Sequence, residues 1–268
     1  MRKIRHMLFA FMVGFGVIVN GLYAQSENVI RSLIESLQAG EPVYYENLTI
    51  IPVYATEVKD STYYTTLDTA LKNDFLTITE MEGGQVPEVK LTNNSDKYIY
   101  IMGGEILTGC KQDRIIGRDV LIGPSRKNIA VPVYCVEQGR WTYQSDNFYS
   151  KENLGLPKLR AEAQRAESSA QSAIWGHISD LNRKMGISTD SGAYQAAYEK
   201  EDVKEKISAI ERQLKDILQM YEDTVGVVVG VGTAVGIAAH AVSTNIRKRK
   251  LIQEEIKSSN QPEKKGGA

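Results

Sequence analysis

Polar side chains of the kinds that bind ligands or transfer protons are concentrated in one stretch of the chain, residues 103–141. Seven of them form a candidate ligand-binding set: Glu105, Lys111, Gln112, Arg114, Glu137, Arg140 and Trp141. The apolar runs at residues 115–122 and 129–136, which lie between the two halves of this set, predict β-strands. Pairing of these strands would bring the two halves side by side, so the pattern predicts a site at strand ends.

Glu105 and Glu137 are the carboxyl groups of this set. Burial and proximity drive the pKa values of two neighbouring carboxyl groups apart, which is how general acid and general base roles divide in a hydrolase. The alternative, which we favour, is that each glutamate forms an ion pair with Lys111, Arg114 or Arg140 and holds the strand ends together. The two glutamates are thus catalytic candidates with a competing structural interpretation.

Arg114 and Arg140 suggest a binding site without a catalyst. Guanidinium groups bind carboxylate or phosphate through paired hydrogen bonds. Gln112 would add directional hydrogen bonds, and Trp141 would add a flat apolar wall. The set therefore predicts a site for a small anionic ligand or a protein partner.

The first 24 residues predict export. Three basic residues precede an apolar run at residues 7–19, and Ala24 ends a short cleavage region, which is the order of a secretory signal peptide. The apolar run is shorter than the roughly 20 residues that a membrane span needs. Removal of residues 1–24 takes away three of the 32 basic residues and none of the 33 acidic ones, which leaves a net charge of 29 − 33 = −4. We expect a periplasmic or secreted protein that does not bind nucleic acid.

Cys110 and Cys135 are the two cysteines of the chain. In an exported protein such a pair is a disulfide candidate, but the spacing does not give the Cα separation that a bridge requires, so two free thiols remain the alternative. Cys135 is also a candidate nucleophile, although no histidine is evidently placed to activate it. His177 and His240 lack metal-ligand spacing with another histidine or a cysteine, and the chain has no phosphate-cradling glycine loop, so we expect no metal and no cofactor.

The remaining elements predict an α+β fold. Strands at residues 47–54, 75–80, 87–91 and 97–102, together with the two strands of the polar stretch, indicate an antiparallel β sandwich or a barrel-like sheet in a β-rich part, residues 28–142. Apolar residues at helical spacing predict two long helices at 157–185 and 202–221, within a helical part, residues 157–221. The tail at residues 251–268 has the composition of a disordered segment.

The apolar segment at residues 224–242 has two interpretations. It is nearly long enough to span a membrane, has small residues at four-residue spacing, and is followed by the basic run at residues 247–250, which would give an envelope protein tethered at its C-terminal end. Alternatively, its valines form a closing β-hairpin at residues 224–239, with the turn at Gly232.

Several motifs resemble one bacterial family: TTLDTAL from Thr65, GGEILTGCKQDRI from Gly103 and VPVYCVEQGRW from Val131. It is the ADP-ribosylglycohydrolase and rhodanese-phosphatase-superfamily-associated protein domain family, first class, whose name records an association and not a demonstrated reaction. The resemblance implies a single domain over residues 28–240 and favours the closing hairpin. Cys110 stands where the family usually has a small residue, which favours its pairing with Cys135.

Overall fold

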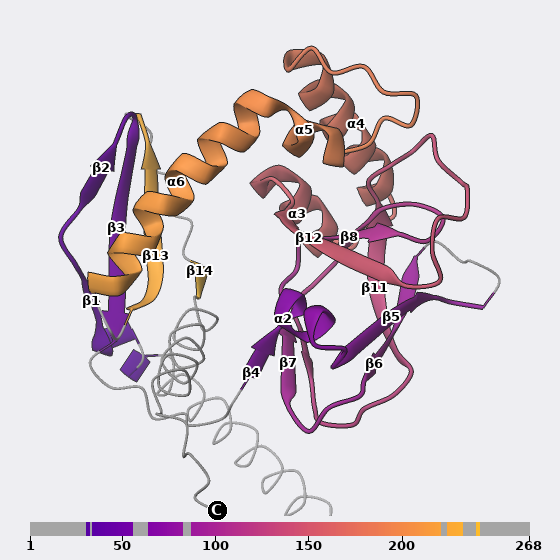
Figure 1. The fold of residues 1–268 in the computed structure, drawn as a ribbon, viewed down its shortest axis with the longest axis horizontal. Helices are drawn as coiled ribbons and strands as arrows, with labels where there is room; N and C mark the ends of the chain where they lie inside the picture. Colours follow the sequence, from indigo (N-terminus) through magenta and orange to yellow (C-terminus); the bar gives the residue numbers. More distant parts are fainter. Residues whose placement is uncertain are drawn as a thin grey trace, which may run out of the picture. The chain divides into compact units, whose positions relative to one another are not determined.

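The computed structural model describes residues 31–32, 34–55, 64–82, 87–220, 224–232 and 240–241 (Figure 1). Contacts within the chain divide it into two compact units, residues 1–61 with 213–249 and residues 62–212 with 250–268. The single domain over residues 28–240 remains a prediction, because a division into compact units does not show whether the units fold together. The signal peptide at residues 1–24 and the tail at 251–268 lie outside the described residues.

The first unit contains an antiparallel sheet built on β3, the strand Leu48–Ala55. Its β-branched residues favour the extended backbone. The other strands of the sheet are β1 Leu37–Ala39, β2 Val43–Tyr45, β13 Thr224–Val231 and β14 His240–Ala241.

The apolar segment predicted as a closing hairpin is represented by β13 and β14. β13 pairs antiparallel with β3, from Thr224 opposite Tyr54 to Val231 opposite Leu48, and β14 pairs with β13 on its other side. The predicted second strand at residues 234–239 lies outside the described residues. Among the residues that the structure describes, no helix is long and apolar enough to cross a membrane.

The second unit contains two sheets. A three-stranded sheet has β4 Tyr64–Thr66 parallel to β7 Tyr98–Ile101, which pairs on its other edge with β10 Val120–Ile122. A six-stranded antiparallel sheet curls into a half-barrel (Figure 1). Its strands in spatial order are β12 Phe148–Leu154, β8 Glu105–Gly109, β9 Arg114–Ile116, β11 Ile129–Cys135, β6 Glu88–Asn93 and β5 Leu76–Glu80. The predicted α+β class with antiparallel sheets is confirmed.

One apolar core fills the space between the two sheets and α2, the helix Leu67–Lys72. Alternate residues of β5, β6 and β7 face this core, as the two-residue period of a strand requires, and Ile78, Leu91 and Ile99 are fully buried. A second core lies between Ile106 and Ile115 of the sheet and the helices that follow the sheet in sequence.

The helical part contains four helices where the sequence predicted two. The prediction of one helix at residues 157–185 was wrong, because the chain forms α3 Pro157–Arg165 and α4 Ala170–Lys184. Ala166 ends α3 in the left-handed region, at φ 53°, which interrupts the helix. α5 Gln195–Glu199 and α6 Glu201–Met220 follow.

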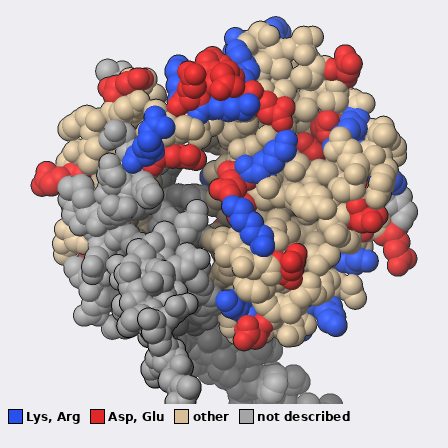
Figure 2. Space-filling model, viewed as in Figure 1, with Lys and Arg blue, Asp and Glu red and all other residues tan. Residues whose placement is uncertain are grey.

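Charges of both signs are interleaved on the face of the molecule that Figure 2 shows. The ion pairs of the second unit include Lys151 with Glu199 at 2.9 Å, and both side chains are about half exposed. Exposed pairs of this kind contribute about 0–1 kcal/mol each. The charges that matter most to the fold are therefore the buried ones in the polar stretch.

Candidate functional site

The site is organised by the turn between β8 and β9, residues 109–113, which we call the turn segment. Register pairs Leu107 with Arg114, so this hairpin closes within six residues. Gly109 has φ 111°, and a Cβ atom on it would lie 2.6 Å from Ser145 Oγ, so the position needs glycine. Asp113 Oδ1 accepts a hydrogen bond from Gly109 N at 3.1 Å and fixes the turn from within.

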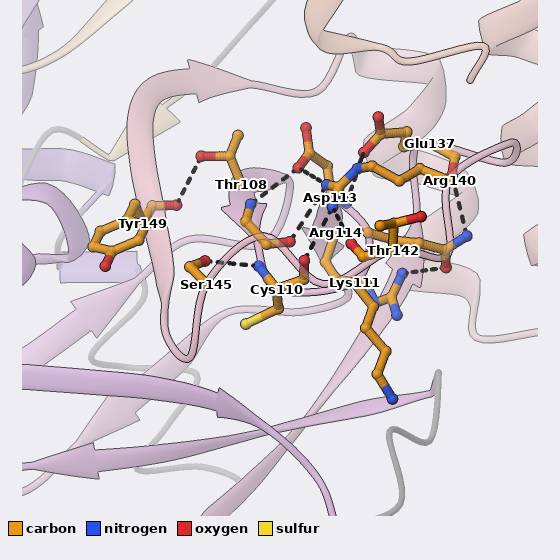
Figure 3. A network of polar contacts seen from close by, with 12 residues as sticks. Thr108, Cys110, Lys111, Asp113, Arg114, Glu137, Arg140, Thr142, Ser145 and Tyr149 are labelled. Carbon is orange, nitrogen blue, oxygen red and sulfur yellow. Dashed lines mark hydrogen bonds and ion pairs between the residues drawn. The ribbon is translucent and has the colours of Figure 1, made fainter. Parts of the chain in front are cut away.

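Arg140 holds the turn segment and both buried carboxylates together (Figure 3). Its Nε donates to Glu137 Oε2 at 2.6 Å, and its Nη2 donates to Asp113 Oδ1 at 2.8 Å. Its remaining hydrogen bonds go to the backbone carbonyls of Cys110, Thr142 and Gly109. All five N–H donors of the guanidinium group are thus engaged, which leaves Arg140 unable to clamp an anion as the sequence predicted.

Asp113 and Glu137 are two carboxyl groups in one low-dielectric environment. The side chain of each is 10% exposed. Burial, and after it the negative charge of Glu137, raises the pKa of Asp113 above its usual range. The neighbouring backbone is tied to the same pair, because Asp113 N donates to Glu137 Oε2 at 3.3 Å.

Asp113 and Glu137 also line a cleft, which we call the carboxylate cleft. Its cavity volume is about 500 Å³. Figure 3 shows the second oxygen of Asp113 and of Glu137 on the same side of the turn segment, with no hydrogen bond drawn to either. One wall of the cleft comes from residues 144–151 and the other from residues 189–199. The lining of the cleft therefore includes two buried carboxyl groups.

Arg114, Lys111 and Trp141 form a second group, which we call the cation face. Figure 3 shows the Lys111 ammonium group on the side of the turn segment opposite the outer carboxylate oxygens. The Trp141 ring centroid lies 5.2 Å from Lys111 Nζ and 5.9 Å from Arg114 Cζ. Gln112 links the two groups, since its Oε1 accepts from Arg114 Nη1 at 2.7 Å and its Nε2 donates to the Glu137 carbonyl at 3.2 Å.

The guanidinium group of Arg114 is buried without a carboxylate partner among the described residues. Arg114 is 1% exposed, and its hydrogen bond to Gln112 engages one of five donors. Burial lowers the pKa of Arg114. Glu80 acts on this charge from a distance but lies nearer to Lys111, with 3.8 Å between Glu80 Oε2 and Lys111 Nζ.

Glu105 is not part of this site. It begins β8, and four residue steps of ~3.3 Å place its Cα about 13 Å from that of Gly109 in the turn segment. Its Oε2 accepts from Met102 N at 2.8 Å. Burial, followed by the negative charge of Asp68, raises its pKa to about 8. The structure therefore does not bring Glu105 together with Glu137 as the sequence predicted.

Cys110 and Cys135 are both buried free thiols. The structure therefore has the predicted alternative of two free thiols and not the disulfide. Their sulfur atoms make separate contacts: Cys110 Sγ with the carbonyl of Asp146 at 3.6 Å, and Cys135 Sγ with the N–H of Glu137 at 3.3 Å. Burial raises the pKa of both thiols, that of Cys110 to about 11. This environment disfavours the thiolate that the predicted nucleophilic role of Cys135 needs.

Asp113 is the residue of the site that the sequence prediction missed. It lies in the same KQDR run as Gln112 and Arg114, and an aspartate between a glycine turn and a strand favours side-chain to backbone hydrogen bonds. That signal indicates a turn and does not reveal that the carboxylate faces Glu137 across Arg140. Within the part of the chain that the structure describes, no group of three or more His, Cys, Asp or Glu residues could hold a metal ion.

Comparison with known proteins connects this geometry to a family. Residues 36–258 match the sequence profile of the ARG and Rhodanese-Phosphatase-superfamily-associated Protein domain. The chain belongs to this family. The match includes residues of both compact units and the whole of the turn segment. No match to the chain is found among curated proteins or among solved structures.

Proposed function

We propose that this family member is an exported domain that binds a small anionic ligand at the cation face. The observation that carries the proposal is the state of Arg114, which is 1% exposed and uses one of its five donors within the described structure. A buried cation without a carboxylate partner costs free energy that a purely structural residue would not require. An incoming carboxylate or phosphate would offset that cost.

Trp141 provides the route to Arg114. Its side chain is 50% exposed, and it lies in a segment without helix or strand. Its ring contacts with Lys111 and Arg114 are cation–π interactions of about 0.5–1 kcal/mol each at exposed sites. Rotation of the ring toward solvent would therefore open Arg114 at small cost, and Lys111 would supply a second positive charge.

The test is a titration of the mature protein with inorganic phosphate and with sulfate. Trp141 and Trp175 are the two tryptophans of the chain, so a Trp175→Phe background assigns the fluorescence to Trp141. We expect a saturable fluorescence change that is lost in Arg114→Met and weakened in Lys111→Met. Arg183→Met is the matched control, because Arg183 is an exposed arginine paired with Asp180.

Arg114→Met also separates ligand binding from scaffold. Methionine keeps much of the volume and removes the uncompensated charge, and such replacements of buried charges are neutral or stabilising. We therefore expect Arg114→Met to melt at or above the wild-type temperature while it loses the phosphate response. A wild-type protein without any phosphate or sulfate response at millimolar concentrations, or an Arg114→Met protein that responds normally, would refute the proposal.

A further inference from the structure

The carboxylate cleft has a surplus of negative charge, which the cation face does not explain. The charged groups among the described residues that line it are three carboxylates, Asp113, Glu137 and Glu199, and two cations, Arg140 and Lys151. Lys151 pairs with Glu199 at 2.9 Å, so these two charges cancel. Arg140 is then the remaining cation of the lining for both Asp113 and Glu137. The pair therefore carries one negative charge in excess.

This excess charge is buried, since the side chains of Asp113 and Glu137 are each 10% exposed. One oxygen of each carboxylate is well satisfied. Asp113 Oδ1 accepts from Gly109 N and Arg140 Nη2, and Glu137 Oε2 accepts from Asp113 N and Arg140 Nε. Figure 3 shows the second oxygen of each carboxylate on the same side of the turn segment, with no hydrogen bond drawn to it. A buried charge without full compensation costs free energy, which a cationic ligand in the cleft would offset.

Lys151 is the internal alternative to such a ligand. Burial and the charge of Glu137 raise the pKa of Asp113, although Arg140 and Lys151 act to lower it. The ammonium group of Lys151 binds Glu199, and its side chain is 51% exposed. A move of Lys151 to Asp113 would break that pair and leave Glu199 as the surplus carboxylate. The charges of the lining therefore favour an added cation whichever carboxylate Lys151 binds.

An alkylammonium group suits the cleft better than a bare metal ion. It is a compact charge with three N–H donors, enough for an oxygen of Asp113, an oxygen of Glu137 and a third acceptor such as the side-chain carbonyl of Gln195, which also lines the cleft. The ring of Tyr149 lines the cleft, is 55% exposed and can contact the charge through a cation–π interaction. Within the described part of the chain, no group of three or more His, Cys, Asp or Glu side chains could hold a metal ion.

A second cavity, of about 940 Å³, adjoins the carboxylate cleft and gives room for the rest of a ligand. The two cavities share Lys151, Gln195 and Glu199 in their linings, and all the residues that line them belong to the second unit. Leu154 and Ile207 supply apolar surface in the second cavity, which methylene groups can cover. A ligand with a cationic end and a carbon chain therefore fits the two cavities together.

We propose that the carboxylate cleft binds the ammonium group of an amine ligand whose carbon chain extends into the adjoining cavity. A linear diamine presents this group on a chain of methylene groups, and so does the side chain of a lysine residue in a peptide. The site uses neither Arg114 nor Lys111, so binding of an amine here and binding of phosphate at the cation face succeed or fail independently.

The test is isothermal titration calorimetry of the mature protein with putrescine and with acetyl-lysine amide. The diol of the same carbon chain and acetyl-norleucine amide are the matched neutral probes, since they keep the chain and lack the ammonium group. We expect saturable binding of a charged probe and binding of its neutral counterpart that is weaker by about 10-fold or more. Binding of putrescine alone would identify a free diamine as the source of the amine, and binding of acetyl-lysine amide alone would identify a peptide.

Two isosteric variants test the role of the surplus charge. Asp113→Asn and Glu137→Gln each keep a carbonyl oxygen that can accept from Arg140 and remove one negative charge. Both should weaken amine binding by about 10-fold or more. Asp180→Asn is the matched control and should bind as the wild type does, because Asp180 is exposed, pairs with Arg183 and lies outside the cleft.

The pH dependence of the wild type supplies a readout that does not depend on the folding of a variant. Amine affinity should fall as the pH is lowered from about 8 to about 4, because protonation of Asp113 removes the surplus charge while the ammonium group stays protonated. The inference would be overturned by the absence of saturable binding of both amines at millimolar concentrations, by equal affinity for charged and neutral probes, or by an affinity that neither the low pH nor the two variants reduce.

Discussion

Replacement of Arg140 by methionine is the most direct test of the buried network. The change removes two charge-assisted hydrogen bonds, to Asp113 and Glu137, and three hydrogen bonds to backbone carbonyls. Charge-assisted bonds contribute about 1.5–3 kcal/mol each, and the carbonyls would lose donors in a site from which water is largely excluded. Because such contributions are not additive, we expect a loss of about 3–5 kcal/mol at pH 7, the range found when one partner of a buried ion pair is removed.

The loss should depend on pH in a defined direction. The pKa of Asp113 is already raised in the folded protein, and removal of the Arg140 charge would raise it further. At a pH above about 3.9, the pKa of an unfolded aspartate, the unfolded chain releases the Asp113 proton while the folded protein with its raised pKa still binds it. The free energy of unfolding therefore falls as pH rises from about 3.9 through the raised pKa of Asp113 in the folded protein. The difference between Arg140→Met and the wild type should accordingly be larger at pH 7 than at pH 4.

Urea unfolding followed by circular dichroism at both pH values measures these differences. Arg183→Met is again the control, since its ion pair with Asp180 joins side chains that are 76% and 54% exposed, and its removal should cost under about 0.5 kcal/mol. A loss below about 1 kcal/mol for Arg140→Met, or one that is the same at pH 4 and pH 7, would refute the account of two carboxylates held by one cation.

Three further predictions follow from other parts of the second unit. Glu105→Gln should flatten the pH dependence of stability between about pH 4.5 and 8, because the raised pKa of Glu105 means that its ionisation is unfavourable in the folded state. Above about pH 8 the variant should be more stable than the wild type. Unfolding free energies measured across that pH range test both expectations. Cys110 and Cys135 should not react with a thiol reagent in the native protein, whereas two thiols should react after unfolding without a reductant; a count of zero would indicate a disulfide. Gly139→Ala should destabilise the protein by about 1–3 kcal/mol, since the added Cβ would lie 2.6 Å from a backbone oxygen. Gly176→Ala in α4 should stabilise the protein by up to about 1 kcal/mol, because no atom lies within 4 Å of the added Cβ. Thermal unfolding distinguishes the two outcomes.

The strands were predicted from the sequence where local pattern and fold agreed. Residues 47–54, 75–80 and 97–102 each became a strand within two residues of the predicted limits. The run at residues 115–122 did not, because it separates into β9 and β10 around residues 117–119. β9 pairs with β8 and β11, and β10 pairs with β7 in the other sheet. This division is decided by long-range pairing, which apolar periodicity does not report.

The candidate site was predicted in composition and only partly in geometry. Sheet pairing does bring both halves of the polar stretch together, from Lys111 to Trp141. Glu105 lies apart from the turn segment, because its distance from that segment is set by the length and direction of β8. Asp113 was left out, because its role depends on the position of Arg140, which is 27 residues away in sequence.

The two arginines of the site show most clearly what composition leaves open. Sequence assigned Arg114 and Arg140 the same role, yet Arg140 engages all five of its donors and Arg114 engages one. Since a satisfied buried cation stabilises its surroundings and an unsatisfied one costs free energy, the same substitution by methionine should have opposite effects at the two positions. Loss of stability at Arg140, without such loss at Arg114, would identify Arg140 as scaffold and leave Arg114 as the residue whose burial only a ligand explains.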